Sequence, residues 1–463
     1  MGVIGRSVVR TAAWAAGVYY RLERAGPGLP DGPVLIVTNH PNMLMDPLLA
    51  LRVAGRRVRV LAKAPLFEIP LFGQVLRSVG TLPLYRVQDD PEQLYRNRLA
   101  FEEAVDVLRG GGALLTFPEG GSRTSPALGP LKTGAARVAL AAEEESDWRL
   151  GVKIVPLGLT YHRKHRFRSR VVAGTGAPIV VAEWRCDYES DRLRAVRSLT
   201  EAVAQGLERQ TLNLADESDR QLVETAELLY ARSKGSARPR QRLALGERLP
   251  QMRRFAELFA WLRVSDPERY EQLDRSLRDY ARSLERLGSG EADVPPRYEV
   301  GPVVRYILRQ AAVLGLGLPL AALAAIAWYV PYFVSNLVCR LIKPEIEMVA
   351  TTKLLAGIIA YPAAYLAWIF LAGKVAGPAA AALTALALPL LGFVALAWIH
   401  RREEVWEDVK LFFQVVHRPR LRERLAEQRA DLATRLDALS AEWSEALAER
   451  RCLEGSPGGE SSR

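Results

Sequence analysis

The chain has 463 residues, of which 49% are hydrophobic and 25% charged, and its net charge at pH 7 is +11. A chain of this length holds two or three structural units, and the positive charge favours an anionic partner such as lipid, a phosphorylated substrate or an acidic carrier protein. Cys186, Cys339 and Cys452 lie far apart in no metal-binding or redox spacing, which excludes a disulfide framework and a cysteine-based zinc site.

Residues 1–30 are expected to form a short helix that lies on a membrane surface. Apolar side chains such as Val8 and Trp14 alternate there with Arg6 and Arg10, a pattern typical of interfacial helices. The segment lacks the apolar core and cleavage site of a removed signal peptide. A helix packed against the following domain is the alternative.

Residues 31–185 alternate short apolar runs with amphipathic stretches, which predicts an α/β domain with a mixed sheet flanked by helices. One helix is expected over 91–109, between the Asp90-Pro91 start signal and three glycines, and another from Lys132 to about Glu145. The expected strands are 33–38, 57–62, 81–86, 112–117, 152–161 and 170–181.

Beyond this domain the strand pattern disappears. Residues 186–300 are charged with apolar residues at three- and four-residue intervals, and we expect packed helices of an accessory region. Residues 301–402 form an apolar block with three segments long enough to meet a bilayer. These segments are 311–338, 354–372 and 378–399.

The distribution of positive charge predicts the topology of this block. Three simple spans would place Arg401 and Arg402 on the opposite side from the basic domain, against the positive-inside tendency. We therefore expect 311–338 to be re-entrant or a hairpin bent at Pro319 or Pro331. The other two segments would span, and the α/β domain would lie on the cytoplasmic side of an integral membrane protein.

The tail, residues 403–452, is expected to be helical, and residues 453–463 to be disordered. An apolar stripe at heptad spacing predicts either a coiled coil, with self-association, or a helix folded back on the accessory region. The stripe consists of Leu425, Leu432, Leu436, Leu439 and Trp443.

The stretch "TNHPNMLMDPLL", residues 38–49, follows an apolar strand and carries a histidine and an aspartate. Pro41 disfavours helical backbone at His40, and Asp46-Pro47 is a helix-start signal. Six steps of 100° place the two side chains on different faces of a helix, so a loop must bring them together. Asp46 could then hold one imidazole nitrogen and leave the other as a base. Alternatively, Asp46 only caps a helix.

Two more expected strands end in polar residues, which matters because open α/β sheets place their sites at strand ends. "TLPLYR" ends at Arg86, and "TFPEGGSRT", residues 116–124, combines glycines with a carboxylate and an arginine. Glycines let backbone amides approach an anion, and arginine or lysine binds phosphate. The candidate binding residues are Arg86, Glu119, Gly120, Gly121, Arg123 and Lys132.

Four blocks of the sequence resemble the glycerol-phosphate acyltransferase superfamily, which includes lysophosphatidate acyltransferases. They are "NHPNMLMD", "GTLPLYR", "FPEGGSRT" and "VPLGLTY", in the family's order and spacing. "LGPLKTGAARVAL", residues 128–140, is similar to fungal-type glycerol-3-phosphate and dihydroxyacetone-phosphate acyltransferases. The resemblance covers about residues 30–180. One departure is that five residues, rather than four, separate His40 from Asp46.

The resemblance implies an α/β acyltransferase domain in which His40 is the general base and Asp46 its orienting partner. It implies that Arg86, Glu119, Gly120 and Arg123 bind the phosphate of glycerol 3-phosphate, dihydroxyacetone phosphate or 1-acylglycerol 3-phosphate. The acyl donor would be acyl coenzyme A or acyl carrier protein. The reaction requires no metal and no cofactor.

Other interpretations remain. The basic run "HRKHRFRSR", residues 162–170, could bind anionic membrane lipid, the phosphates of coenzyme A or an acidic carrier protein. Alternatively, it is a solvated strand edge. The enzyme would alternatively acylate another lysophospholipid or lipid precursor, or the chain would be a non-catalytic lipid-binding scaffold. A nucleic-acid partner fits the charge but not the apolar block, and the sequence has no reader motif.

Overall fold

The computed structural model describes residues 3–85, 95–123, 125, 127–214, 216, 218–233, 244–286, 300–416 and 419–454. It divides into two compact units. The first is Met1–Asn213 with Tyr332–Ala360, and the second is Leu214–Pro331 with Tyr361–Arg463. The first unit thus contains the expected α/β domain, residues 31–185, together with the N-terminal helix and part of the apolar block.

A mixed sheet lies at the centre of the first unit, as the sequence predicts. Among the described residues it has eight strands, seven of them in the order β1-β7-β6-β2-β5-β3-β4, with β8 beside β6. Strand β2 is parallel to β5 and β6, and β3 is parallel to β4 and β5, whereas β7 is antiparallel to β6. The strands are β1 (Arg21–Ala25), β2 (Val34–Thr38), β3 (Val58–Lys63), β4 (Leu82–Leu84), β5 (Ala113–Thr116), β6 (Lys153–Tyr161), β7 (Arg170–Thr175) and β8 (Ile179–Val180).

Two strands differ from the prediction. Strand β1, which pairs with β7, was not expected, because its sequence "RLERA" is charged and short. The single strand expected over 170–181 is divided into β7 and β8. Pro178 lies in the gap, and proline cannot donate a ladder hydrogen bond.

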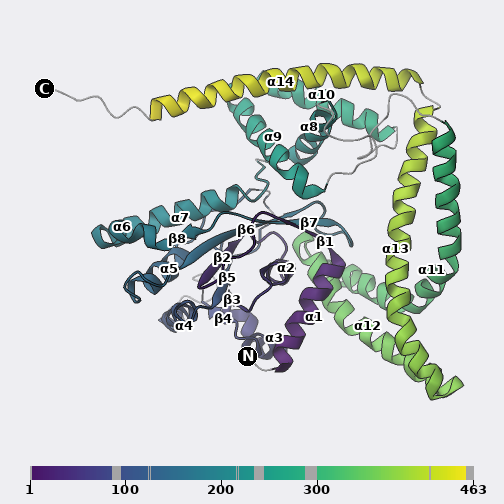
Figure 1. Ribbon diagram of the computed structural model, residues 1–463, viewed down its shortest axis with the longest axis horizontal. Coiled ribbons are helices and arrows are strands. Elements are labelled where there is room, and N and C mark those ends of the chain that lie inside the picture. The colour runs from purple at the N-terminus through teal and green to yellow at the C-terminus, as the bar shows by residue number, and fades with distance from the viewer. Residues whose placement is uncertain are drawn as a thin grey trace. The chain divides into compact units, whose positions relative to one another are not determined.

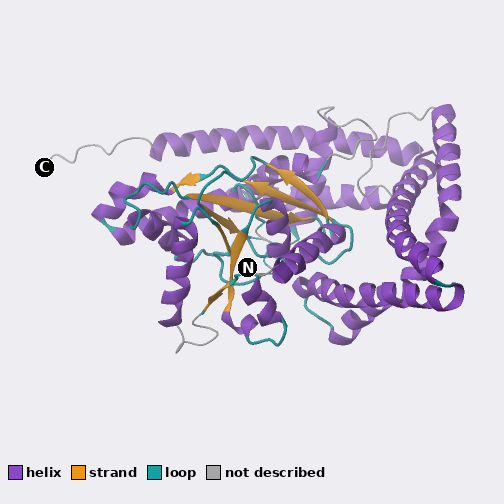
Figure 2. Ribbon diagram, turned by 60° about the horizontal axis from the view of Figure 1, so that its bottom comes forward, coloured by secondary structure: helices purple, strands orange, loops and turns teal. Residues whose placement is uncertain are grey.

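Helices cover both faces of the sheet (Figure 2). In β2, Val34 and Ile36 enter one core while Leu35 and Val37 enter the other, which is the pattern of a strand buried on both sides. Helices α1 (Val3–Tyr19), α2 (Met45–Ala54) and the start of α12 (Ile346–Ala376) contribute to the first core. Helices α4 (Asn97–Arg109), α5 (Gly134–Glu144) and α7 (Arg192–Glu208) contribute to the second. Shorter elements are η1 (Ala64–Phe67), α3 (Phe72–Ser78), η3 (Val181–Trp184) and α6 (Arg185–Ser190).

The N-terminal helix α1 packs against the domain, which is the alternative to a helix lying free on a membrane. Ala16 and Tyr19 are buried in the first core. Trp14, which lies about 160° around the helix from Ala16 at about 100° per residue, is 50% exposed, and Val8 near the start of the helix is 42% exposed. The helix therefore buries part of its surface in the fold and leaves other apolar side chains exposed.

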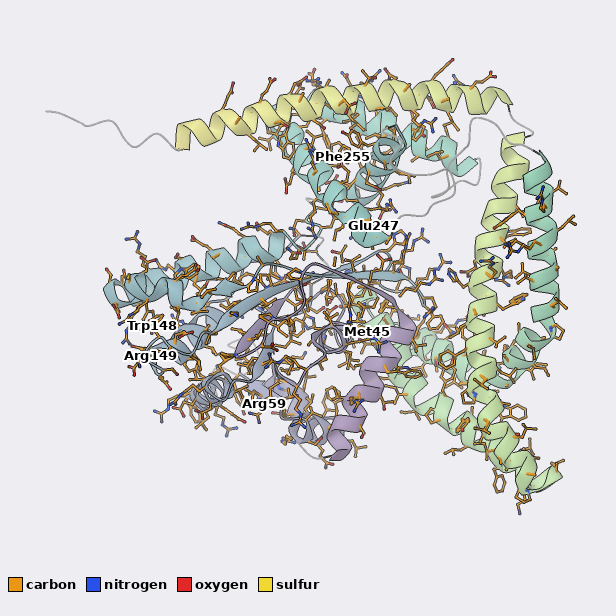
Figure 3. The ribbon with its side chains drawn as sticks, in the orientation of Figure 1. Met45, Arg59, Trp148, Arg149, Glu247 and Phe255 are labelled. Atoms are coloured by element: carbon orange, nitrogen blue, oxygen red, sulfur yellow. The ribbon has the colours of Figure 1, made fainter. Side chains whose placement is uncertain are left out.

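The second unit contains a bundle of α8 (Asp219–Ser233), α9 (Leu245–Ser265), α10 (Pro267–Arg286) and α14 (Pro419–Glu454). Phe255 is one of its buried side chains (Figure 3). The apolar stripe of α14 is also buried, and Glu442 of the same helix forms an ion pair with Arg269 of α10. The folded-back alternative is thus confirmed within this chain, and the stripe expected to support a coiled coil is already covered.

Within the described part of the chain, three helices are long and apolar enough to cross a membrane: α11 (Val300–Ile342), α12 and α13 (Pro378–Val416) (Figure 1). The prediction of a re-entrant segment or hairpin at 311–338 is wrong, because α11 continues through Pro319 and Pro331. Proline removes one backbone hydrogen bond but is tolerated in apolar helices. The apolar part of α11 has 39 residues, or roughly 58 Å at about 1.5 Å per residue, which exceeds the ~30 Å hydrocarbon core.

Candidate active site

Three neighbouring parallel strands direct polar residues to one edge of the sheet. Because β2, β5 and β6 are parallel, their carboxyl ends meet at the same edge. His40 follows β2, Glu119 follows β5, and Tyr161 ends β6. Asn39 fastens the first loop to the third strand, since its side chain donates to the carbonyl oxygen of Leu159 at 3.0 Å and accepts from its amide at 2.8 Å.

His40 and Asp46 are in direct contact, as the sequence predicts. Nδ1 of His40 lies 2.8 Å from Oδ2 of Asp46, and the side chains are 18% and 0% exposed. The loop between them includes Met43 with φ of 41°, a conformation that few non-glycine residues adopt. Helix α2 begins at Met45, with Leu44 as its N-cap, so Asp46 is in the first turn instead of capping the helix.

Asp46 accepts hydrogen bonds from three donors. Besides His40, the backbone amide of Asn42 donates to Oδ2 at 2.6 Å and the hydroxyl of Tyr161 donates to Oδ1 at 2.6 Å. Hydrogen bonds of this kind fix the orientation of a buried carboxylate. When Nδ1 of His40 donates its hydrogen bond to Asp46, Nε2 is left to act as a base. Among the described residues, Nε2 has no hydrogen-bond partner.

Further contacts restrain the imidazole and its carboxylate. The ring of Phe117 stacks on His40 with centroids 4.0 Å apart. Tyr20 accepts a hydrogen bond from the Asn42 side chain at 2.7 Å and donates to the carbonyl oxygen of Lys164. Burial, and next the charge of Asp46, raise the pKa of Tyr161 well above its usual value, so its hydroxyl remains a donor.

Sequence reasoning did not identify Tyr161 and Tyr20 as part of the site. Tyr161 was within reach, because it ends the quoted "VPLGLTY" block and lies at a strand end. Tyr20 follows α1, far from the site in sequence, and no local pattern places it beside Asn42.

Glu119 has contacts that differ from its expected role. Its Oε1 accepts from the backbone amide of His40 at 3.1 Å, and its Oε2 accepts from the amide of Gly129 at 3.0 Å. The side chain is 9% exposed, and a carboxylate repels a phosphate. The geometry favours a role of Glu119 in joining the His40 loop to the loop before α5, and binding of the acceptor by Glu119 stays a prediction.

Gly120 and Lys132 come together as an anion site requires. A Cβ added at Gly120, whose φ is 76°, would lie 2.9 Å from Nζ of Lys132. The amide of Lys132 donates to the carbonyl oxygen of Pro118 at 2.8 Å, which closes this loop. Only glycine lets the ammonium approach the backbone so closely.

Arg123 lies at the same loops. Its backbone amide donates to the carbonyl oxygen of His40 at 3.0 Å, and its guanidinium lies against Gly129. Among the described residues, neither Arg123 nor Lys132 has a carboxylate partner, so both positive charges are available to an anion. Gly121 belongs to the same turn and is partly exposed. Arg86 lies outside the described residues.

Residues 20–160 match the family model described as Acyltransferase. The match spans β1 to β5, most of β6 and the loops that carry His40 and Glu119. It supports the resemblance to the glycerol-phosphate acyltransferase superfamily that was drawn from the four sequence blocks.

Individual relatives share this domain. "Glycerol-3-phosphate O-acyltransferase 2" of Saccharomyces cerevisiae is 33% identical over 193 residues, which is 42% of this chain and 25% of that protein. "1-acyl-sn-glycerol-3-phosphate acyltransferase LPAT1, chloroplastic" of Arabidopsis thaliana is 29% identical over 129 residues, 28% of this chain and 32% of that protein. The chain therefore spans about a quarter to a third of the length of these two relatives.

A crystal structure of the 1-acyl-sn-glycerophosphate acyltransferase PlsC from Thermotoga maritima was also matched. Its sequence is 19% identical, the TM-score is 0.33, and the match covers 44% of this chain and 80% of that one.

Proposed function

We propose that the chain transfers a fatty acyl group from an acyl thioester to the hydroxyl group of a glycerol-phosphate acceptor. The observation that carries the proposal is the contact between His40 and the buried Asp46, with Nε2 left without a protein partner among the described residues. An oriented neutral imidazole is the standard general base for an alcohol. The names of the relatives supply the chemical class of the acceptor.

The reaction follows from this arrangement. Nε2 of His40 takes the proton of the acceptor hydroxyl as its oxygen attacks the thioester carbonyl. The carbon–sulfur bond then breaks, the ester bond remains, and the thiolate leaves with the proton returned by His40. Asp46 stabilises the imidazolium that exists between the two proton transfers. The acceptor is itself the nucleophile, so no acyl-enzyme forms.

Anchoring of the acceptor's phosphate would supply much of the rate. General base assistance raises a rate about 10²- to 10⁴-fold. Holding two reactants in the right geometry can lower the activation barrier further. We propose that the phosphate is bound by Lys132, Arg123 and the glycine turn at Gly120 and Gly121. Acyl coenzyme A or acyl carrier protein is the proposed donor.

The three apolar helices support association with a membrane, where the acyl products reside. We propose that the acyltransferase domain lies on the cytoplasmic side, where acyl thioesters are made and where positive loops concentrate. The basic loop 162–170 would then face anionic lipid.

The test uses the full chain in membranes, with labelled acyl thioester and a panel of acceptors. Glycerol 3-phosphate, dihydroxyacetone phosphate and 1-acylglycerol 3-phosphate are compared with glycerol and with lysophosphatidylcholine. We expect turnover only with phosphomonoesters, and loss of turnover in His40→Ala. His165→Ala is the matched control, since the exposed His165 contributes only its backbone carbonyl to a contact with Tyr19. Full activity of His40→Ala would overturn the proposal.

A further inference from the structure

Asp46 is oriented by a residue outside the "NHPNMLMD" block, which carries both members of the proposed catalytic pair. Its Oδ1 accepts the hydroxyl of Tyr161 at 2.6 Å, whereas its Oδ2 accepts from His40 and from the amide of Asn42. All three donors act on a carboxylate that is fully buried. The two donors to Oδ2 are His40 itself and Asn42, two residues later in the same loop. Tyr161, at the end of β6, is the donor that comes from another element.

We propose that Tyr161 is a positioning residue that fixes the carboxylate plane of Asp46 and moderates its charge, and thereby sets the orientation and basicity of His40. This inference rests on the proposed function for its kinetic consequences, but not for its effect on the proton held by His40.

The packing around Tyr161 supports a fixed role. Its ring meets that of Tyr20 edge to face, with centroids 5.1 Å apart, and the residue is 5% exposed. The Tyr20 hydroxyl accepts from the Asn42 side chain at 2.7 Å. Two tyrosines in mutual contact, one following α1 and one at the end of β6, therefore bind Asn42 and Asp46 of the segment that carries the pair.

The chemistry gives the direction of the effect. Each hydrogen bond donated to the carboxylate spreads part of its negative charge. Without the Tyr161 hydroxyl, more of that charge acts on the imidazole, and the His40–Asp46 pair retains its proton to a higher pH. The carboxylate is also free to rotate, which misaligns Nδ1 and lowers the rate.

Tyr161→Phe removes the hydroxyl and keeps the ring that packs on Tyr20. Thr160→Val is the matched control, because it deletes a hydroxyl from the adjacent residue of the same strand. The Thr160 Oγ1 atom is buried and has no hydrogen-bond partner among the described residues. Both variants retain Glu119, Tyr20 and Lys164, whose side chains contact residues 40–42 in the described part of the chain.

The first measurement does not depend on turnover. The rate at which diethylpyrocarbonate modifies His40 in the full chain is followed by peptide mass spectrometry as a function of pH, since only the neutral imidazole reacts. We expect the midpoint to move upward by roughly half a unit or more in Tyr161→Phe and to stay in place in Thr160→Val. An unchanged midpoint in Tyr161→Phe would overturn the inference, whether or not the chain is an acyltransferase.

The second measurement is kinetic. In Tyr161→Phe we expect kcat to fall roughly 10- to 100-fold, the Michaelis constants for donor and acceptor to stay within about twofold, and the acidic limb of the pH–rate profile to move to higher pH. In an Asp46→Asn background the same substitution should have little further effect, because contacting residues are not additive. Independent, multiplicative losses would show that Tyr161 does not act through Asp46.

Discussion

The backbone amide of His40 donates a hydrogen bond of 3.1 Å to Oε1 of Glu119. The proposed base is therefore held through its main chain by the "FPEGGSRT" block and through its imidazole by Asp46. Since Oε2 of Glu119 accepts from Gly129, one buried carboxylate determines the spacing between two loops of the site.

Glu119→Gln should lower kcat more than it raises the Michaelis constant of the acceptor. The new amide group presents a donor to a backbone donor on one side, so one of the two loops loses its partner. We expect roughly a 10-fold or greater loss of kcat, with about 1–3 kcal/mol of stability lost. The loss of kcat is measured by steady-state kinetics on the purified chain, with rates normalised to the amount of folded protein.

Glu143→Gln is the matched control for this substitution. Glu143 is also a buried carboxylate that accepts from two backbone amides, those of Leu150 and Val152, but it lies on α5 in the second core. Glu143→Gln should lower the free energy of unfolding by a similar amount and leave kcat per folded molecule unchanged. If both variants lose kcat in proportion to stability, Glu119 has no role specific to the site.

Gly120→Ala should raise the Michaelis constant of the phosphorylated acceptor several-fold. An added Cβ strains a backbone at φ 76° and displaces the ammonium of Lys132. Lys132→Met should reproduce the increase, because both changes remove the same charge from the proposed phosphate position. Initial rates at varied acceptor concentration, at fixed salt, give the constants.

Gly111→Ala separates strain from the loss of the ammonium contact. Gly111 has a similar φ of 70°, but a Cβ there would meet nothing within 4 Å. It should cost comparable stability and leave acceptor binding unchanged. The same rise of the Michaelis constant in both glycine variants would argue against a phosphate position beside Lys132.

The sequence was sufficient for features that depend on local patterns. The apolar run of β2 and the polar residues after β2 and β5 located the sheet, its candidate active edge and the pairing of His40 with Asp46. The side-chain periodicity of a strand and the parallel arrangement of α/β sheets determine these features. The sequence pattern also identified the apolar helices, because length and composition define them.

Other features depend on contacts between distant residues, which no local pattern encodes. The contacts by which Glu119 joins two loops were not predicted, since its partners are backbone amides 79 and 10 residues away. Tyr20 reaches Asn42 only after α1 packs on α2. The continuity of α11 was missed because the distribution of positive charge favoured a segment bent at a proline, whereas an apolar helix can accommodate proline.

Leu436→Ala in α14 tests whether the apolar stripe stabilises the helical unit from within one chain. Leu436 is fully buried, and α14 contacts α8, α9 and α10, so truncation should cost about 2–5 kcal/mol. The measurement is the thermal unfolding midpoint in detergent at several protein concentrations, with the exposed Arg435→Ala as control, for which the cost should be below about 0.5 kcal/mol. If the stripe packs within one chain, the decrease in the unfolding midpoint does not depend on protein concentration, because folding is then unimolecular. If instead the midpoint of the unsubstituted chain rises with protein concentration, and that of Leu436→Ala does not, the stripe forms a coiled coil between chains.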